Sequence, residues 1–512
     1  MAIPASWKQT ELSEILLSII GGGTPSKSIP SYYEGNIPWM SVKDMNKSIL
    51  QDTVDHISEE AVKNSSTNVI PSGTPIVATR MSLGKIVVAN FDSAINQDLK
   101  ALFPASGVNH EYLIGWYRSI SRKVEELGMG TTVKGIRLEV LKSLEFPLPP
   151  LGEQKVIADK LDTLLAQVEA TKARLERIPE ILKTFRQSVL ADAVSGKLTE
   201  EWRAVNKSDF TKEERLEEIR KYKYETWIEE QEAKYEAKGK WPKTDSWKKK
   251  YKEAEIDPEF KSRELPESWV NQPLDGLVYI SARIGWKGLK ASEYTQSGPL
   301  FLSVHSLNYG REVKLSEAFN ISPERYDESP EIMLQNDDIL LCKDGAGIGK
   351  IGIVKNLAEP ASINSSLLLI RSGKYFVPEF LYFFLAGPTM QRLVQERMTG
   401  SAVPHLFQRD VKEFVLEIPP ISEQREIVRR VEELLAFADG IEQKANAALQ
   451  RVNNLTQSIL AKAFRGELTA NWRAANPESI CGENSAEALL EKIKAEREAF
   501  KPVKKSSVRK KS

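Results

Sequence analysis

The chain has 512 residues, of which 41% are hydrophobic and 28% charged, a composition typical of globular proteins with two to four domains. Its 71 basic and 71 acidic side chains balance, which argues against a simple basic nucleic-acid binder, whose pI usually exceeds about 9. Two cysteines exclude a disulfide framework, and we expect neither a signal peptide nor a membrane span, so a reducing cytoplasm is the expected location.

Residues 1–148 have the pattern of a β-rich α/β domain. Short runs of β-branched and other apolar residues predict strands at residues 37–42, 75–78 and 85–89, because Gly, Asn and Pro separate them. Residues 109–122 predict a helix.

Residues 149–203 predict one long helix that carries a coiled-coil stripe. After a Pro-Pro pair, apolar residues recur at alternating steps of four and three, with Thr171 as the polar interruption. Glu153 lies in the first turn, where it favours the helix dipole, and Gly196 lies where a C-terminal cap is expected. Pro179 predicts a kink or break rather than a domain boundary. The expected seam residues are Ile157, Leu161, Leu164, Val168, Leu175, Ile178, Leu182, Phe185 and Val189.

Residues 204–265 differ from both flanking segments. They hold 16 basic and 16 acidic side chains among 62, and we interpret them as a solvated helix over residues 212–234 followed by a connector rich in Trp and Lys.

The second half of the chain repeats the first. With a shift of 270 positions, the Pro-Pro pairs at 149 and 419, the Glu-Gln pairs at 153 and 423 and the Trp-Arg pairs at 202 and 472 coincide without a gap. Upstream, the offset drifts down to 262, where residues 4–7 meet 266–269. Residues 266–418 are therefore expected to form a second domain, with a strand at 367–370 and a helix at 378–396.

Residues 419–473 carry the second stripe, and residues 474–512 are expected to form a short helix and a basic tail. Gly466 is the expected helix cap. For residues 501–512 we leave open a frayed tail or a weak attraction to phosphate. The second seam consists of Ile427, Val431, Leu434, Ile441, Val452, Leu455 and Ile459.

The two stripes can bury each other. Each predicted helix is roughly 60 Å long at about 1.5 Å per residue, and antiparallel pairing would give a pseudo-two-fold repeat with the domains at opposite ends. The alternative is that each stripe packs on its own domain. The expected fold is therefore α+β, with two β-rich α/β domains joined by two long antiparallel coiled-coil helices.

No catalytic or metal-binding constellation is evident in the sequence. The four histidines are scattered without metal-ligand spacing. The stretch from Gly345 to Lys350 resembles a phosphate-binding loop but lacks its first Gly and its final Ser or Thr, so we interpret it as a tight turn between strands.

Several motifs resemble those of a known family. The block Gly22-Gly-Thr-Pro, with Pro38-Trp-Met-Ser-Val-Lys-Asp44 after it, looks like the start of a target-recognition domain. The Pro-Pro-x-x-Glu-Gln block, the long helix and the Gly-x-Leu-Thr-x-x-Trp-Arg ending resemble type I restriction–modification specificity subunits. In the second domain, Gly285-Trp-Lys-Gly288 replaces the opening motif, which is expected if the two domains recognise different bases.

The resemblance implies a DNA-specificity subunit that is not catalytic alone. Each domain would recognise one half of a bipartite, asymmetric site in double-stranded DNA, and the helices would fix the gap. Two modification subunits, which carry S-adenosylmethionine and methylate adenine, would dock on the helices. Restriction subunits would add translocation and cleavage that depend on ATP and Mg²⁺. No cofactor or metal is expected in this chain, and a prokaryotic cytoplasm is the implied location.

Candidate DNA contacts follow residue type and repeat position, since Arg and Lys suit guanine edges and phosphates while Asn and Gln suit adenine edges. For the aromatic residues Tyr32, Tyr33, Trp39 and Trp286, the alternative to stacking on a base is packing in a core. For Asn96 and Asn364, the alternative to contacting a base is capping a turn. In the first domain the candidates are Lys27, Tyr32, Lys43, Arg80, Lys85, Asn96, Gln97, Lys134 and Arg137. In the second domain they are Arg283, Trp286, Lys287, His305, Asn308, Lys343, Lys350, Asn364, His405, Gln408 and Arg409.

Two other functions remain open at this stage: a coiled-coil adaptor that joins two protein-binding domains without DNA, and a standalone nuclease. The domains themselves are slightly acidic, with 14 basic and 15 acidic side chains in residues 1–148 and 15 and 18 in residues 266–418. We therefore expect the chain alone to bind DNA weakly or through a localised basic face.

Overall fold

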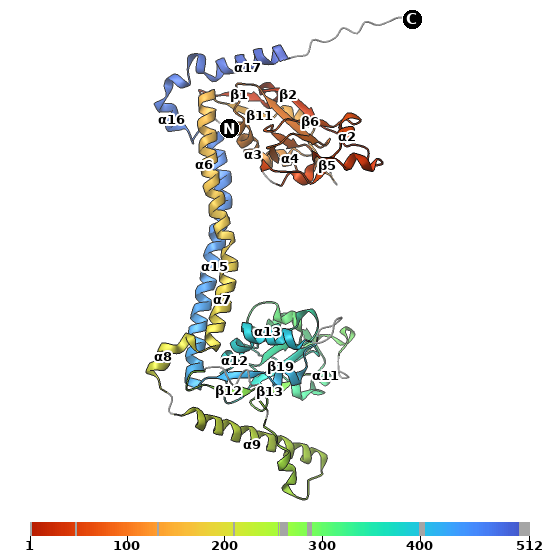
Figure 1. Cartoon of the computed structure of the whole chain (residues 1–512), viewed down its shortest axis with the longest axis vertical. Coiled ribbons are helices and arrows are strands. Elements are labelled where there is room, and N and C mark those ends of the chain that lie inside the picture. The colour runs from red at the N-terminus through yellow and green to blue at the C-terminus, as the bar shows by residue number, and fades with distance from the viewer. Residues whose placement is uncertain are drawn as a thin grey trace. The chain divides into compact units, whose positions relative to one another are not determined.

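The structure is a computed structural model that describes residues 3–46, 49–130, 133–207, 210–253, 255–256, 265–283, 289–398 and 405–500. It divides into two compact units of mixed helix and sheet (Figure 1). Unit 1 contains residues 1–176 and 445–512, and unit 2 contains residues 177–444.

Unit 1 is built around two sheets. The five-stranded sheet has the order β2-β10-β7-β8-β4 and the four-stranded sheet the order β5-β3-β9-β6, while β1 and β11 form an antiparallel pair. The strands are β1 (Lys8–Glu11), β2 (Leu16–Gly21), β3 (Ile37–Met40), β4 (Ile49–Leu50), β5 (Asp55–Ile57), β6 (Asn68–Ile70), β7 (Ile76–Ala78), β8 (Ile86–Ala89), β9 (Ser93–Ile95), β10 (Leu99–Pro104) and β11 (Glu145–Leu148).

Some helices of unit 1 pack on these sheets, among them α3 on β8 and α17 on β2. Helix α3 is capped by Asn109, whose side chain accepts a hydrogen bond from the N–H of Tyr112, and it buries Trp116 against Phe146 with ring centroids 4.8 Å apart. The helices are α1 (Leu12–Ile15), α2 (Glu59–Lys63), α3 (His110–Ser119), α4 (Ser121–Glu126), α5 (Leu138–Lys142), α6 (Leu151–Glu176), α16 (Ala470–Ala475) and α17 (Ala486–Phe500).

Unit 2 repeats these strand connections among its described residues, without counterparts of β4 and β6. Its sheets have the orders β13-β19-β16-β17 and β15-β14-β18, and β12 pairs with β20 as β1 pairs with β11. The parallel pair β14–β18 corresponds to β3–β9. The strands are β12 (Val270–Pro273), β13 (Val278–Ser281), β14 (Thr295–Leu302), β15 (Phe319–Asn320), β16 (Ile339–Cys342), β17 (Ile351–Ile353), β18 (Ala361–Ile363), β19 (Leu367–Ser372) and β20 (Val415–Ile418).

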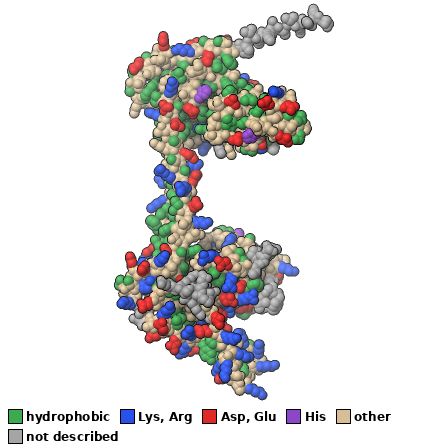
Figure 2. Space-filling model, viewed as in Figure 1, with side chains coloured by type: hydrophobic (Ala, Val, Ile, Leu, Met, Phe, Trp, Pro, Cys, Tyr) green, Lys and Arg blue, Asp and Glu red, His purple; other side chains and the backbone are tan. Residues whose placement is uncertain are grey.

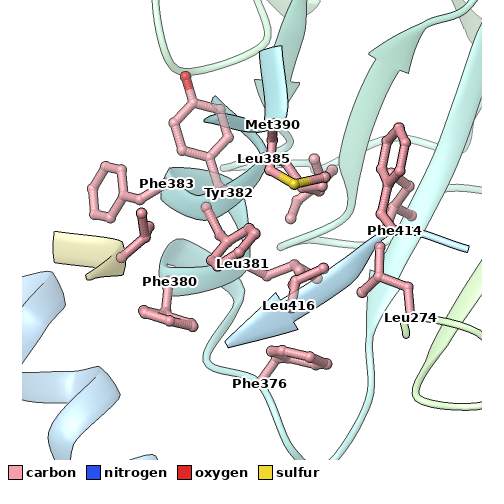
Figure 3. Packing of buried hydrophobic residues seen from close by; sticks show 14 of the residues in the cluster. Leu274, Phe376, Phe380, Leu381, Tyr382, Phe383, Leu385, Met390, Phe414 and Leu416 are labelled. Carbon is pink, nitrogen blue, oxygen red and sulfur yellow. The ribbon is translucent and has the colours of Figure 1, made fainter. Parts of the chain in front are cut away.

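The core of unit 2 gathers around the apolar helix α12, whose Phe380, Leu381 and Phe383 are fully buried (Figure 3). The predicted strands occur where the sequence indicates, and Gly345 and Gly349 form the expected tight turn between β16 and β17, both with positive φ. The single helix predicted at residues 378–396 was wrong, because the chain breaks at Gly387-Pro388 into two helices, and the helix predicted at residues 109–122 corresponds to α3 and the start of α4. The helices are α7 (Ile178–Val194), α8 (Glu200–Val205), α9 (Lys212–Lys238), α11 (Pro323–Asp327), α12 (Pro378–Ala386), α13 (Pro388–Arg397) and α14 (Gln408–Lys412).

The long helices pair antiparallel inside each unit. In unit 1, α6 runs against residues 445–464 of α15 (Ile421–Phe464), and Lys160 Nζ donates to the carbonyl of Leu468, just beyond the end of α15, at 3.1 Å. In unit 2, Arg186 of α7 forms ion pairs with Asp439 and Glu442, both at 2.7 Å. The helices also pack on the domains, since α6 contacts α3 and α7 contacts α12. Both arrangements considered from the sequence therefore occur together.

Eight of the 16 predicted seam residues are buried, and seven more are half-buried. Leu455 departs from the expected seam because its side chain is 48% exposed. A heptad stripe drifts by about 20° per heptad on a straight helix, so not every member can face the partner. The break predicted at Pro179 is confirmed, since α6 ends at Glu176 and α7 begins at Ile178. The expectation that no domain boundary lies there was wrong, because the division between the two units falls at the same place. The buried seam residues are Ile157, Leu161, Val168, Leu182, Val189, Ile427, Val431 and Ile459; Leu164, Leu175, Ile178, Phe185, Leu434, Ile441 and Val452 are half-buried.

The connector helix α9 is more than a solvated helix. Its Ile219 is fully buried in the core of unit 2, and Leu216 and Tyr222 pack beside it. The buried ammonium of Lys223 donates to the carbonyl of Pro273 at 3.1 Å, and burial lowers the pKa of Lys223 to about 8. The expectation of a solvated helix was therefore wrong for this face.

Candidate nucleic-acid interface

A buried carboxylate joins the two repeats in unit 1. Glu153, at the start of α6, is fully buried and accepts the indole N–H of Trp7 at 2.9 Å. Its other oxygen accepts from Thr469 Oγ1 at 2.6 Å and from the guanidinium of Arg473 at 2.5 Å. The Arg473 guanidinium also donates to the carbonyl of Gly466 at 2.6 Å. A buried charge needs such a complete set of partners.

Unit 2 contains the same junction with the repeats exchanged. Glu423, 1% exposed, accepts from the indole of Trp269 at 2.9 Å, from Thr199 Oγ1 at 2.7 Å and from Arg203 Nε at 2.9 Å. The ending of the first repeat therefore binds the start of the second, as the ending of the second binds the start of the first. The Glu–Thr and Glu–Arg contacts of both junctions were not predicted, because their partners come from different repeats.

Both junctions need a glycine at the end of the long helix. Gly196 and Gly466 adopt the left-handed conformation, with φ of 79° and 75°, as expected for a helix cap. A Cβ at Gly466 would lie 2.4 Å from Pro4 Cγ, and one at Gly196 would lie 2.7 Å from Pro266 Cγ. The Pro that opens each repeat therefore packs directly against the glycine that ends the other repeat's helix.

The Gly-Gly-Thr-Pro loop of unit 1 is held by close packing. A Cβ at Gly22 would lie 1.8 Å from the carbonyl oxygen of Ile95, so only glycine fits. The indole of Trp39 donates to the carbonyl of Gly23 at 3.2 Å, and the hydroxyl of Tyr33 donates to the carbonyl of Pro25 at 2.7 Å. The packing role considered for the two aromatic residues is what the structure shows.

This loop forms one wall of a hollow of about 700 Å³. The hollow is lined from four loops at strand ends, and four candidates from the sequence meet there: Lys27, Lys43, Asn96 and Gln97. The Lys43 ammonium lies 2.8 Å from Asp55, and this hydrogen bond raises the pKa of Lys43. Arg80 lies beside the hollow, 3.4 Å from the buried carboxylate of Asp98, which lines it.

The other candidates in unit 1 divide into surface and packing positions. Lys85, Lys134 and Arg137 are exposed. Tyr32 is 7% exposed and packs in a small core, which leaves no ring face for a base. Asn96 is also buried, and its Oδ1 accepts from the N–H of Asp98 at 3.1 Å, so it caps a turn.

The equivalent place in unit 2 has different side chains on the same backbone frame. An isolated antiparallel bridge joins Arg80 to Gly135 in unit 1, and another joins Asp344 to His405 in unit 2. In unit 2 the His405 ring hydrogen-bonds the Asp344 carboxylate, which also pairs with Lys343. The backbone position that carries Arg80 in unit 1 therefore carries Asp344 in unit 2, where His405 and Lys343 contact its carboxylate. Asp344 was not among the predicted contacts.

The remaining candidates of unit 2 form a second group. Lys350 donates to Asn308 Oδ1, and the exposed His305 lies 3.2 Å from Glu317. Arg409 is exposed and lies over the ring of Phe407, with 4.9 Å to the ring centroid, whereas Gln408 donates to the carbonyl of Ile280 at 2.6 Å.

Two candidates of unit 2 have packing roles, and two lie outside the described residues. Arg283 is 3% exposed, lies over the ring of Phe301 and donates to the carbonyl of Ile363 at 3.3 Å; burial lowers its pKa. Asn364 accepts from the N–H of Ser366 at 3.1 Å, so it caps a turn as Asn96 does. Trp286 and Lys287 lie outside the described residues.

Within the described residues, no group of three or more His, Cys, Asp and Glu side chains is arranged to hold a metal ion. In the described part of the chain, no helix is both long and apolar enough to cross a membrane.

Comparison with known proteins defines the class. Residues 4–180 and 266–451 both match the family model of the type I restriction modification DNA specificity domain, so the chain carries this domain twice. It is 42% identical to the type I restriction enzyme EcoBI specificity subunit of Escherichia coli over 72% of this chain and 68% of that one. It is 34% identical to the EcoDI specificity subunit of Escherichia coli over 97% of this chain and 96% of that one. The chain belongs to the specificity subunits of type I restriction enzymes.

Solved structures show the same fold. One, from work on assembly and conformational transition of a type I R-M system, covers 91% of this chain and 99% of its own, with a TM-score of 0.61 and 15% identity. The HsdS subunit from Thermoanaerobacter tengcongensis covers 91% of this chain and 98% of its own, with a TM-score of 0.55 and 16% identity. The α+β fold with a tandem repeat and long helices is thus confirmed.

Proposed function

We propose that each domain of this specificity subunit recognises one half of a bipartite, asymmetric DNA site. The observation that carries the proposal is the pair of equivalent bridges, Arg80–Gly135 and Asp344–His405. The two domains share strand connections but present different hydrogen-bonding groups at the same backbone position. Such a pair is what two different half-sites require, since each base pair has its own pattern of donors and acceptors in the major groove.

Individual roles follow from chemistry and position. Arg80 suits the acceptor edge of guanine, and Gln97, which lines the hollow, suits adenine. Asp344 suits the amino group of cytosine, with His405 fixing the orientation of its carboxylate. Lys27, Lys85, Lys134 and Lys350 suit phosphates, which set the position of the duplex without identifying bases.

We further propose that the paired helices set the gap between the half-sites and dock two modification subunits. The proposal is supported by the ungapped match between the two helical segments, in which each Glu-to-Thr span has the same length. Half-sites one DNA turn apart have centres about 34–36 Å apart, a distance that helices of this length can bridge.

In this proposal the chain has no catalytic role of its own. The modification subunits carry S-adenosylmethionine for adenine methylation, and restriction subunits carry the ATP and Mg²⁺ that translocation and cleavage need. A prokaryotic cytoplasm is the proposed location.

Selection of bound DNA tests the proposal. The full chain, assembled with its modification subunits, is incubated with random duplexes, and the DNA in the shifted band is sequenced. Enrichment of two short motifs at a fixed separation is the expected result. Absence of any enriched motif would instead support the alternative function, an adaptor that joins two protein-binding domains, which the neutral net charge favours. Metal-dependent cutting by the purified chain would support a nuclease.

A further inference from the structure

The connector between the repeats contains a strongly basic hairpin, followed in sequence by an acidic stretch at residues 253–264. We call residues 235–252 the lysine hairpin: it comprises the last turn of α9, the turn at Gly239 and the 3-10 helix η4 (Asp245–Lys250). The segment holds seven lysines but only two carboxylates, although the connector as a whole is neutral. Figure 2 shows Lys and Arg side chains gathered where Figure 1 draws the turn after α9.

An aromatic cluster gives the lysine hairpin a defined shape. Trp247 is 6% exposed, with its ring centroid 5.4 Å from Tyr235 and 5.8 Å from Trp227. Tyr251 closes the other side, 5.5 Å from Trp227. Gly239 ends α9 in the left-handed conformation, with φ of 60°, and turns the chain back. The lysines therefore project from a folded element with its own small core.

The charge of this element is not neutralised within the described part of the chain. Lys240, Lys243, Lys249, Lys250 and Lys252 are exposed, and no ion pair joins any of them to another described residue. Lys248 pairs with Asp245 at 3.0 Å. Lysines earlier on α9 differ, because Lys221 and Lys234 each pair with a glutamate four residues away on the same helix. A cluster of unneutralised lysines creates a local positive potential, even on a chain with no net charge.

We propose that the lysine hairpin binds the phosphate backbone of duplex DNA without sequence preference, as a contact separate from the two base-recognising surfaces. The inference rests on the proposed function for the identity of the ligand. The chemistry fits phosphates better than bases, since Tyr235, Trp247 and Tyr251 pack against one another or against Trp227, which leaves Trp241, 58% exposed, as the one open ring of the hairpin. The ammonium groups around it are compact point charges. The hairpin is the localised basic face that a slightly acidic pair of recognition domains needs.

A four-lysine variant with a charge-matched control tests this. The hairpin variant replaces Lys240, Lys243, Lys249 and Lys250 with Gln in the full chain. The control replaces four exposed lysines that each pair with a carboxylate on their own helix, and so removes the same formal charge: Lys63, Lys221, Lys234 and Lys494. Affinity for a random-sequence duplex is measured by fluorescence anisotropy over a series of salt concentrations.

We expect the DNA affinity of the hairpin variant, but not that of the control, to depend less steeply on salt concentration. Each phosphate contact contributes about 0.9 to the slope of log K against log salt, so the slope should fall by about 2–4 and the affinity at ~0.1 M salt at least about tenfold. Lysine-to-arginine replacement at the same four positions should restore both values. Thermal melting checks that the variants are folded.

Two results would overturn the proposal. The first is that the slope of log K against log salt is the same for the hairpin variant as for the unmodified chain or the control. The other is an unchanged slope together with weaker binding of the modification subunits, which would make the hairpin a protein-binding element. Sequencing of bound DNA separates this outcome from failure of the proposed function, because the hairpin variant should still select the same bipartite motif.

Discussion

The hydroxyl of Thr469 donates to the carboxylate of Glu153, 316 residues earlier in the chain, at 2.6 Å. The pair Thr199 and Glu423 repeats this contact at 2.7 Å. Each specificity domain is thus closed by the helix ending of the other repeat. This exchange gives the Leu-Thr-x-x-Trp-Arg ending, which occurs in both repeats, a structural role at the two junctions.

Replacing Glu153 with Gln should strongly destabilise unit 1. The substitution removes the charge that pairs with the guanidinium of Arg473, whose side chain is 15% exposed, and leaves that cation uncompensated. Removing one partner of a buried ion pair typically costs about 3–5 kcal/mol. Calorimetry of the full chain should show a lowered first transition. Glu467→Gln, which removes an exposed ion pair with Arg465, is the control and should melt as the unmodified chain does.

Gly466→Ala should also destabilise the junction. Alanine in the left-handed conformation costs about 1–2 kcal/mol, and the added Cβ would collide with Pro4 Cγ at 2.4 Å. The control is Gly440→Ala inside α15, where a Cβ meets no atom within 4 Å. There, alanine should stabilise by about 0.5–1 kcal/mol because it favours the helix. Denaturant titration compares the two, and equal effects would contradict the assigned role of Gly466.

Lys223 should make stability depend on alkaline pH. Its pKa of about 8 in the folded chain lies below the ordinary value of 10.5, so the unfolded chain binds more protons between these values and stability rises with pH across that window. Below pH ~8 the cost of the buried charge is fully present, on the order of 3 kcal/mol. Lys223→Met should therefore stabilise the chain at pH 7, and the gain should shrink towards pH 10.5. A gain that does not change with pH would show that the ammonium is not the cause.

Arg80→Ala and Asp344→Asn should each affect one half-site only. Loss of a bidentate contact to a base typically removes about 1–3 kcal/mol of discrimination, or roughly 5- to 150-fold in preference. Sequencing of DNA bound by each variant should show one relaxed position in one half and an unchanged second half. Relaxation of both halves by one substitution would contradict the assignment of one domain to each half-site.

An insertion just beyond α7, which ends at Val194, should alter the gap between the half-sites and leave their bases unchanged. Four residues inserted between Leu198 and Glu201 add about one turn, or about 5.4 Å of helix. The insertion lies beside Thr199, which must still reach Glu423. Sequencing of the selected DNA should show the same two half-sites at a new separation. Altered half-site bases would show that the helices do not act as a spacer.

Much of the fold could be predicted because periodicity is local. Runs of apolar residues with glycine and proline between them gave the strands, and the heptad stripe gave the long helices. The heptad spacing wrongly predicted Leu455 as a buried seam residue, because a heptad stripe drifts around a straight helix and its side chain is exposed. The packing of α9 was missed because Leu216, Ile219 and Tyr222 are a sparse apolar group in a segment dominated by charges.

The candidate surfaces were harder to predict, because residue type does not determine burial. Tyr32 and Arg283 have the chemistry of DNA contacts but lie in cores. Asn96 and Asn364 cap turns, which the sequence had left open as the alternative to a DNA contact. Asp344 was missed because acidic side chains were not among the residue types considered, and only its bridge to His405 shows that it holds the position equivalent to Arg80 of the other domain.

Methylome sequencing of the host with and without this chain tests whether its two domains recognise two half-sites. We expect methylated adenines within one bipartite, asymmetric motif of fixed gap, and the loss of methylation at every such site when the chain is removed. Two results would contradict the claim that two domains recognise two half-sites. One is methylation that does not change when the chain is removed, and the other is loss of methylation at a single continuous motif without a gap.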